Sequence, residues 1–402
     1  MKIVFKKYIK NENNYLDLQI EIKDKRLFLI LKLKWRMSMI AAVYHGINNM
    51  TVENLAKPKV EPGTILLKVK ACAICGGDLR TFRFGHDQIK PPMVLGHEVA
   101  GEIVEVATDV KNYSVGERII VAPAIGCGTC SYCLSGWQNM CYTRKTIAHH
   151  YNGGFAEYML IPAGAVRAGN INRIPTEVTY LSASLAEPLA CVLNAQEVMN
   201  IGLGDTVAVI GAGPIGCMHA EVARGRGAGK VFMINRSAKR LEATKQFNFD
   251  AYIDLSSTDG LKAVMDLTGG MGANVVIVTA GSGDAQNLGI SMASKMGKVC
   301  LFAGLPKNQP KIEMDANYVH YRQIAVFGAF SSAPRHNALA LEMIRSGKVS
   351  VEKILTHLVS LDKIREGMDL VDNRDAFRVS VSPCIDEIRD EIERHPGLKV
   401  IE

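Results

Sequence analysis

Hydrophobic positions follow two different spacing patterns along the chain. Between residues 40 and 162, short apolar runs are separated by Gly and Pro, a pattern typical of strands in a compact, mostly β unit. The five clearest runs are IAAVYHG (40–46), TILLKVKAC (64–72), VAGEIVEV (99–106), ERIIVAP (117–123) and AEYMLIP (156–162). The first part of the chain is therefore predicted to be mainly β-sheet.

Beyond about residue 189 the rhythm changes to strand-length apolar runs separated by helix-length segments. The six predicted strands are VAVI (207–210), VFMI (231–234), AYID (251–254), VVIV (275–278), VCLF (299–302) and IAVF (324–327). Because these runs are almost wholly apolar, we expect both faces of their sheet to be covered. The alternation predicts the α/β class, with a parallel, doubly wound sheet.

The remaining segments complete the predicted organisation. FRVSVSP (377–383) is the expected final strand, and residues 385–395 are an expected surface helix that turns Ile385, Ile388 and Ile392 inward. The predicted units are an N-terminal extension outside the fold (1–38), a mostly β domain (39–188), a doubly wound domain (189–328) and a return to the first domain with a tail (329–402).

The net charge of +7 over 402 residues is concentrated at the N-terminus. Residues 1–36 hold ten Lys and Arg against four Asp and Glu, a balance of +6, which leaves +1 for the rest. A nearly neutral body argues against a nucleic-acid partner. No run reaches the roughly 20 apolar residues of a membrane span, so we expect no membrane partner and a cytoplasmic location. We expect the natural start at Met37 or Met39, the alternative being an added strand through Leu31, Leu33 and Trp35.

Four cysteines, Cys127, Cys130, Cys133 and Cys141, stand close together in GCGTCSYCLSGWQNMC. Their spacing suits one tetrahedral Zn²⁺ with every position filled by protein, which holds structure and leaves no place for a substrate. Disulfides, a [4Fe–4S] cluster and a nucleic-acid-binding zinc module are the alternatives. Disulfides need an oxidising compartment, and the zinc module needs a basic helix that this Gly-rich segment lacks. We expect a structural-zinc lobe over 126–142.

A glycine-rich turn follows the predicted strand 207–210 and opens a helix-length run. In this context Gly211, Gly213 and Gly216 form the G-x-G-x-x-G signature of a dinucleotide site. Gly211 permits the tight turn, Gly213 lets the pyrophosphate approach the backbone, and Gly216 allows close helix–strand packing. The alternative is a turn that merely connects strand and helix.

The residue that usually selects between NAD and NADP is not acidic here. An Asp or Glu about twenty residues after the turn would bind the ribose of NAD. That position is Asn235, followed by Arg236, with Lys239 and Arg240 nearby. Since no carboxylate would repel a 2′-phosphate and Arg236 could pair with one, the sequence favours NADP, or the use of both cofactors.

A second metal site is predicted from residues far from the four-cysteine lobe. Cys75 in CAICGGDLR and His97 and Glu98 in PPMVLGHEVAGEI indicate a zinc with an open coordination position. Asp78 is the expected partner that fixes the ring of His97. Glu187, at the change from the β to the α/β region, is expected to face the cleft between domains, the alternative being an exposed helix carboxylate.

Together these motifs resemble the zinc-containing medium-chain dehydrogenases, nearest to the polyol and threonine dehydrogenase group. The resemblance covers roughly residues 39–383 and rests on ICGGDL (74–79), GHEVAGEI (96–103), the four cysteines, AEPLA (186–190) and VIGAGPIG (209–216). It implies a GroES-like catalytic domain beside a Rossmann domain, and two zinc ions per chain. It also implies that the protein forms a homodimer or homotetramer.

The resemblance also implies roles for single residues. Cys75, His97 and Glu98 would hold the catalytic zinc, and Glu187 would bind the zinc water or exchange with it as ligand. The cofactor would contact the positions of Ile215, Asn235 and Arg240. Relatives usually carry Ser or Thr at the position of Gly77, and often His at that of Arg80, so the ordinary proton relay is absent here. Some sorbitol enzymes lack the four cysteines, which favours the threonine-like and bacterial polyol branches.

The activity expected is oxidation of a secondary alcohol to a ketone by hydride transfer to NAD or NADP. A polyol or cyclitol is the first expectation for the substrate, followed by a sugar-alcohol phosphate or L-threonine. Arg80, Arg83 and His86, within RTFRFGHDQIK (80–90), could bind an anionic group of the substrate, or could form an exposed basic loop. A zinc-free reductase and a non-enzymatic cofactor sensor are the competing classes.

Overall fold

The computed structural model describes residues 4–5, 20–21 and 37–402. Two short strands, β1 (Val4–Phe5) and β2 (Ile20–Glu21), pair antiparallel. The main body starts with β3 (Ser38–Gly46). The predictions for the N-terminal extension, including the strand through Leu31, Leu33 and Trp35, lie almost wholly outside the described residues.

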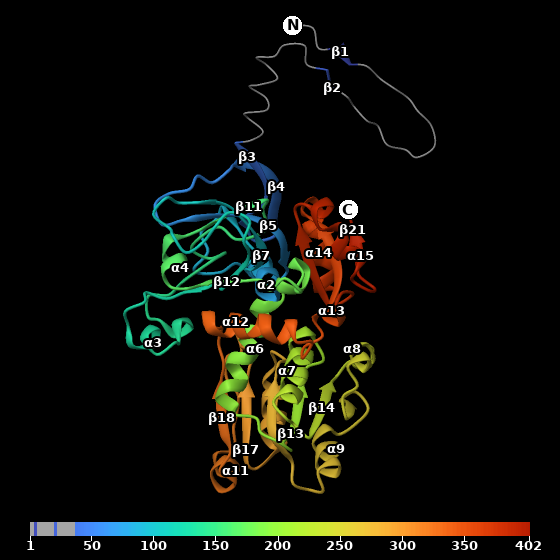
Figure 1. The fold of residues 1–402 in the computed structure, drawn as a ribbon. Helices are drawn as coiled ribbons and strands as arrows, with labels where there is room; N and C mark the ends of the chain where they lie inside the picture. The colour runs from blue at the N-terminus through green and yellow to red at the C-terminus, as the bar shows by residue number, and fades with distance from the viewer. Residues whose placement is uncertain (1–3, 6–19, 22–36) are drawn as a thin grey trace.

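The body has an upper part rich in β-structure and a lower part built on a second sheet (Figure 1). The upper sheet has the order β12–β8–β7–β5–β20–β19–β21, and β11 pairs with β5. Its strands are β5 (Ile65–Ala73), β7 (Glu98–Val106), β8 (Arg118–Val121), β11 (Tyr158–Ile161), β12 (Ile171–Arg173), β19 (Leu355–Ser360), β20 (Arg378–Ser382) and β21 (Lys399–Ile401). All five runs predicted in this region form strands.

A smaller sheet of the upper part contains a strand that the sequence did not reveal. Its order is β4 (Asn49–Ala56), β3 and β6 (Met93–Val94). β4 has the polar, mostly exposed sequence NMTVENLA, so it lacks the apolar alternation by which a strand is recognised. It pairs with β3 through a two-residue turn in which Asn48 has φ 56°, a conformation that asparagine tolerates.

The lower sheet confirms the doubly wound prediction. Its six parallel strands have the order β15–β14–β13–β16–β17–β18, which is 3-2-1-4-5-6 in chain order. They are β13 (Thr206–Ile210), β14 (Lys230–Asn235), β15 (Ala251–Asp254), β16 (Ala273–Val278), β17 (Ala293–Leu301) and β18 (Ala325–Gly328). The associated helices are α7 (Pro214–Gly225), α8 (Ala238–Thr244), α9 (Gly260–Leu267), α10 (Gly283–Ser291) and α11 (Ala316–Arg322).

Helices join the two parts of the body. α6 (Ala186–Met199) is buried along most of its length and packs against α7 and α12 (Pro334–Arg345). One continuous apolar cluster includes Leu189 and Val192 of this helix together with Val207 and Val209 of β13. The predicted boundary between residues 188 and 189 lies inside α6, and the division of the chain into domains stays a prediction.

The shorter elements connect these layers. They are α2 (Gly76–Phe84), β9 (Ala124–Ile125), α3 (Ser131–Leu134), η1 (Gln138–Met140), β10 (Lys145–Thr146), α4 (Ala163–Arg167), α5 (Tyr180–Ala183), η2 (Lys245–Phe247), α13 (Val351–Ile354), η3 (Leu361–Lys363), α14 (Ile364–Asp372), η4 (Ile385–Ile388) and α15 (Arg389–Glu393). None of the helices in the described ranges is long and apolar enough to cross a membrane.

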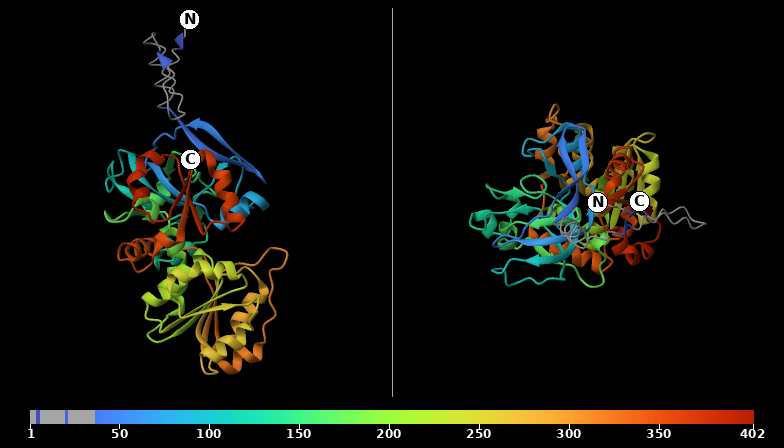
Figure 2. Two further views of the ribbon diagram at one scale, coloured as in Figure 1. Left: turned by 90° about the vertical axis from the view of Figure 1, so that its right-hand side faces the viewer. Right: turned by 90° about the horizontal axis from the view of Figure 1, so that it is seen from above.

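The C-terminal segment returns to the upper part, as the left view in Figure 2 shows. FRVSVSP forms β20, but the prediction that it is the final strand is wrong, because β21 follows and pairs with β19. β21 is only three residues long, too short for a periodic signal. The predicted helix over 385–395 is a 3₁₀ turn, η4, followed by α15, with Ile385 and Ile388 buried.

We predict that Glu391 anchors this tail. Its carboxylate is buried and accepts hydrogen bonds from the backbone N–H groups of Tyr180 (3.0 Å) and Leu181 (3.2 Å). Glu391→Ala would leave both donors unpaired, so the free energy of unfolding in urea should fall by about 1–3 kcal/mol. Glu393→Ala, two residues away and exposed, is the control and should leave it unchanged. Equal stability of both variants would contradict this role.

Candidate functional site

Three predicted metal ligands converge in the upper part of the body. Cys75 immediately precedes α2, and His97 and Glu98 stand where β7 begins. One ligand atom from each residue lies within 4.8 Å of the others. Bonds of about 2.0–2.3 Å to a tetrahedral zinc would put the donors roughly 3.3–3.8 Å apart, so a small inward movement suffices.

The start of α2 fixes the positions of Cys75 and Asp78. Cys75 is the N-cap residue, and its Sγ accepts a hydrogen bond from the N–H of Gly77 (3.3 Å). Asp78 Oδ2 accepts from the N–H of Cys75 (2.9 Å), and its Oδ1 lies 3.5 Å from His97 Nδ1. Burial acts to raise the pKa of Asp78, but His97 and the backbone N–H groups of Cys75 and Gly96 outweigh it and lower that pKa. Asp78 is therefore an anion beside the imidazole.

Glu98 is fully buried and forms an ion pair with Arg378 of β20. Burial raises the pKa of Glu98, and the Arg378 guanidinium opposes that rise. The second carboxylate oxygen, Oε2, has no hydrogen-bond partner among the described residues. A buried oxygen without a donor suits a metal ligand. Arg378 was not among the predicted site residues, although a charged residue within the otherwise uncharged strand RVSVS indicates a buried partner.

Glu187 lies in the first turn of α6 and is buried, close to the three-residue group but not part of it. Its Oε1 accepts a hydrogen bond from the Cys191 thiol at 3.4 Å. Its charge contributes to the raised pKa of Glu98, so the two carboxylates are near enough to interact. This placement suits an exchangeable ligand more than a permanent one.

The prediction of a basic loop over residues 80–90 is wrong for Arg80 and Arg83, which lie in α2; Arg80 is exposed, and His86 follows the helix. Arg83 forms an ion pair with Asp372 of α14, so its charge is already compensated within the protein. His86 lies against His149, with ring centroids 4.4 Å apart. Burial lowers the pKa of His149 to about 4, and its Nδ1 is buried without a partner in the described structure. His149 was missed because only the fold brings residues 86 and 149 together.

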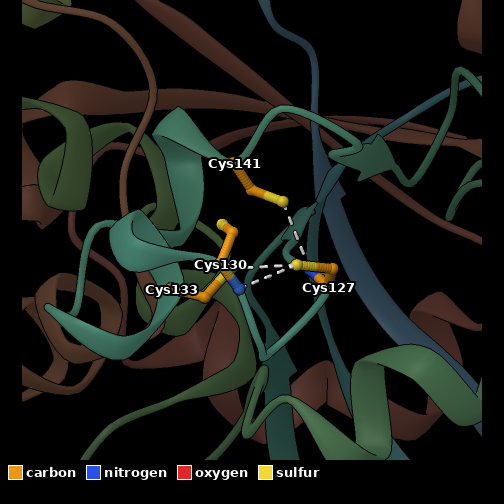
Figure 3. A group of neighbouring side chains, drawn as sticks. All are labelled: Cys127, Cys130, Cys133 and Cys141. Carbon is orange, nitrogen blue, oxygen red and sulfur yellow. Dashed lines mark hydrogen bonds between the residues drawn. The ribbon is translucent and has the colours of Figure 1, made fainter.

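The four cysteines of the predicted lobe face one another (Figure 3). Cys127 Sγ and Cys133 Sγ are 3.9 Å apart, and all four sulfurs lie within 4.8 Å of one another. The hydroxyl of Thr129 and two backbone N–H groups lower the pKa of Cys127 to about 5, which favours its thiolate. The ten cysteines of the chain all lie in the described part and none forms a disulfide. The donor set and spacing fit one zinc ion.

The lobe is attached to the centre of the molecule. Asn139 Nδ2 donates to the carbonyl of Phe330 (2.9 Å), and Arg335 Nε donates to that of Gly136 (3.2 Å). The Arg335 guanidinium also covers the ring of Trp137 at 4.9 Å and forms an ion pair with Glu197 of α6. The lobe is therefore held against the same helix that carries Glu187 in its first turn.

The glycine turn of the lower sheet has the geometry of a dinucleotide site. It connects β13 with α7, and Gly211 has φ 121°. A Cβ atom on Gly216 would lie 1.9 Å from the carbonyl oxygen of Gly211, so only glycine fits. Gly213 is the N-cap residue of α7, whose N-terminal dipole favours a pyrophosphate. Ile215 packs against the core cluster behind the turn.

Asn235 and Arg240 frame this turn. Asn235 ends β14, and its Oδ1 accepts a hydrogen bond from the N–H of Ala212 (3.3 Å). The Nη1 atom of Arg240 lies 3.3 Å from where a Cβ on Gly213 would stand. Arg236 is exposed. The predicted cofactor residues therefore lie together at the carboxyl ends of β13 and β14.

Comparisons with known proteins agree with this architecture. Residues 61–170 match the alcohol dehydrogenase GroES-like domain, and residues 214–346 match the zinc-binding dehydrogenase family. Sorbitol dehydrogenase of Halalkalibacterium halodurans is 32% identical over 354 residues, which cover 86% of this chain and 99% of that protein. The L-threonine 3-dehydrogenase of Pyrococcus abyssi is 33% identical, covering 78% and 89%.

A relative with a phosphorylated substrate and a solved structure are also similar. D-arabitol-phosphate dehydrogenase of Enterococcus avium is 30% identical, covering 84% of this chain and 94% of that protein. A zinc-binding dehydrogenase from Sinorhizobium meliloti, crystallised with NADP, has a TM-score of 0.79 at 30% identity and covers 86% and 99%. The chain belongs to the zinc-containing medium-chain alcohol dehydrogenase family, with a GroES-like domain and a Rossmann domain.

We predict that the two metal sites can be emptied separately. Purified protein should contain two zinc ions per chain, and both Cys75→Ala and Cys130→Ala should reduce this to one. Cys130→Ala should also lower the melting temperature, because the lobe is held together by its metal and contacts α6 and α12. Cys75→Ala should change that temperature much less. Elemental analysis and thermal unfolding give both quantities, and a wild type with a single zinc would contradict the assignment.

Proposed function

We propose that the protein is a zinc- and NAD(P)-dependent dehydrogenase that oxidises a secondary alcohol of a polyol or cyclitol to a ketone. The observation that supports this proposal most directly is that Cys75, His97 and Glu98 converge in a chain that also forms a dinucleotide-binding turn. The similarity to a sorbitol dehydrogenase over nearly its whole length supports this substrate class. The proposed domain division is 39–188, 189–328 and 329–402, with 1–38 as an extension.

The proposed roles follow from the surroundings of each residue. Cys75, His97 and Glu98 hold the catalytic zinc, Asp78 keeps the imidazole of His97 oriented, and Arg378 orients Glu98. Glu187 approaches as an exchangeable ligand. A zinc held there would supply a Lewis acid that stabilises negative charge on the alcohol oxygen. Cys127, Cys130, Cys133 and Cys141 hold the structural zinc.

The substrate proton cannot leave through the hydroxyl that relatives usually carry at the position of Gly77. Gly77 has no hydroxyl, so the residue at this position of α2 cannot relay the proton. Glu187 is buried near the metal ligands and can accept a proton, and a second hydroxyl of a polyol or a water molecule can relay one by passing on its own proton as it receives another. A polyol suits this site because it brings such a hydroxyl with it.

The cofactor and the assembly are part of the same proposal. Gly211, Gly213, Ile215 and Gly216 would hold the pyrophosphate, and Asn235, Arg236 and Arg240 the adenosine end of NADP or NAD. Its nicotinamide would supply the hydride acceptor. We also propose a cytoplasmic homodimer or homotetramer, as is usual in the family.

The test is an alcohol panel assayed with NAD and with NADP on zinc-loaded protein. Secondary polyols and cyclitols should be oxidised, and His97→Ala should lower kcat/KM by roughly a thousandfold, since a metal Lewis acid contributes several kcal/mol. Sugar-alcohol phosphates and L-threonine belong in the panel. If a phosphorylated alcohol or L-threonine is oxidised faster, that compound and not a polyol is the substrate. No turnover of any alcohol would contradict the dehydrogenase proposal.

A further inference from the structure

Arginines from both parts of the body lie near the segment that follows β14. Arg236 and Arg240 belong to the segment that includes α8, directly after β14. Arg374 follows α14, which belongs to the C-terminal segment of the upper part. Figure 1 shows α8 at the upper end of the lower part, on the side of this segment.

One ion pair places the loop after α14 against α8. Lys239 Nζ, in α8, lies 3.5 Å from Asp375 Oδ1, the residue next to Arg374. The charge of Arg374 also reaches Arg240, where it adds to burial in lowering the pKa of the Arg240 guanidinium. The two arginines therefore face a common region, although about 130 residues separate them in the chain.

These arginines have no compensating acid. Within the described residues, the side chains of Arg236, Arg240 and Arg374 form no ion pair or hydrogen bond. The carboxylates nearest in the chain are already engaged. Asp375 faces Lys239, Asp372 pairs with Arg83, and Glu242 pairs with Lys245. Because these positive charges repel one another and no carboxylate compensates them, they indicate an anion-binding site.

The amide of Asn235 already makes two hydrogen bonds beside the glycine turn, so it offers the ribose less than a free carboxylate would. Its Oδ1 accepts from the N–H of Ala212, and its Nδ2 donates to the carbonyl of Ser237 at 3.2 Å. An Asp here would present a second carboxylate oxygen to the ribose hydroxyls, whereas the amide of Asn235 makes its hydrogen bonds beside the glycine turn. Recognition of the adenosine end therefore depends more strongly on the arginines around Asn235.

Arg374 adopts an unusual backbone conformation. Its φ is 64°, in the left-handed region where glycine and asparagine are preferred, and its side chain is exposed. The N–H groups of Arg374 and Asp375 bond to the carbonyls of Val371 (3.2 Å) and Leu370 (3.0 Å), which close the end of α14. An arginine in this place is not explained by the turn itself.

We propose that Arg374 is a cofactor-selectivity residue that reaches across the two parts of the body and, with Arg236 and Arg240, binds the 2′-phosphate of NADP. This rests on the proposed NAD(P)-dependent function and adds a residue to it from outside the Rossmann domain. A phosphomonoester dianion presents three oxygens, enough for guanidinium groups from two or three arginines. NADP binding would then also link the loop after α14 to α8.

The test uses the adenosine half of the cofactor, so that neither zinc nor turnover enters the result. Adenosine 2′,5′-bisphosphate and 5′-AMP are titrated calorimetrically against wild type, Arg374→Asn and Arg374→Lys. Asparagine suits φ 64° and removes the charge, so the fold is kept. Arg374→Asn should weaken the bisphosphate about tenfold and leave 5′-AMP unchanged, with Arg374→Lys between the two.

Two controls sharpen this measurement. Arg389→Gln removes a positive charge from α15 of the same C-terminal segment and should change neither affinity. Arg240→Gln should weaken both ligands, because Arg240 lies over the glycine turn, and should weaken the bisphosphate more. Unchanged binding of the bisphosphate by Arg374→Asn, or an equal loss for both ligands, would overturn the proposal. Failure of the dehydrogenase proposal would instead appear as an absence of alcohol oxidation with intact binding of these fragments.

Discussion

The buried ion pair between Glu98 and Arg378 is the interaction on which the organisation of the site depends. The two residues are 280 positions apart, on β7 and β20, and the pair lies in the centre of the upper sheet. A buried carboxylate is costly unless its charge is compensated. Glu98 and Glu187 act on each other and on Arg378, so the two carboxylates carry more negative charge than Arg378 alone compensates. Arg378 and a bound metal would together balance it.

This requirement explains why the chain returns to the upper part after the second sheet. The C-terminal segment inserts β20 beside β5, which precedes Cys75 directly, and so brings Arg378 to the metal ligands. The same segment positions Asp372 against Arg83 and Glu391 against α5. α6 also contributes to the site: Glu187 in its first turn lies near the metal ligands. Glu197 in its last turn forms an ion pair with Arg335 of α12. The site is thus assembled from both ends of the chain.

Local signals predicted much of this, and the limits of prediction have physical causes. The six apolar runs of the lower sheet and the glycine turn were recognisable because buried parallel strands and dinucleotide turns impose a pattern on neighbouring residues. The four cysteines were recognisable for the same reason. β4 and β21 were missed because one is polar and the other has three residues. Arg378, His149 and Arg374 were missed because the residues they interact with lie far away in the sequence.

The most direct measurement is a double-mutant cycle between Glu98 and Arg378, made on zinc-free protein by unfolding in urea. If the ion pair has the central role described above, Glu98→Gln and Arg378→Met will each lower the free energy of unfolding by about 3–5 kcal/mol, because each leaves one buried charge alone. The double variant will lose less than the sum by at least about 2 kcal/mol. Additive losses, or single losses below about 0.5 kcal/mol, would contradict the account.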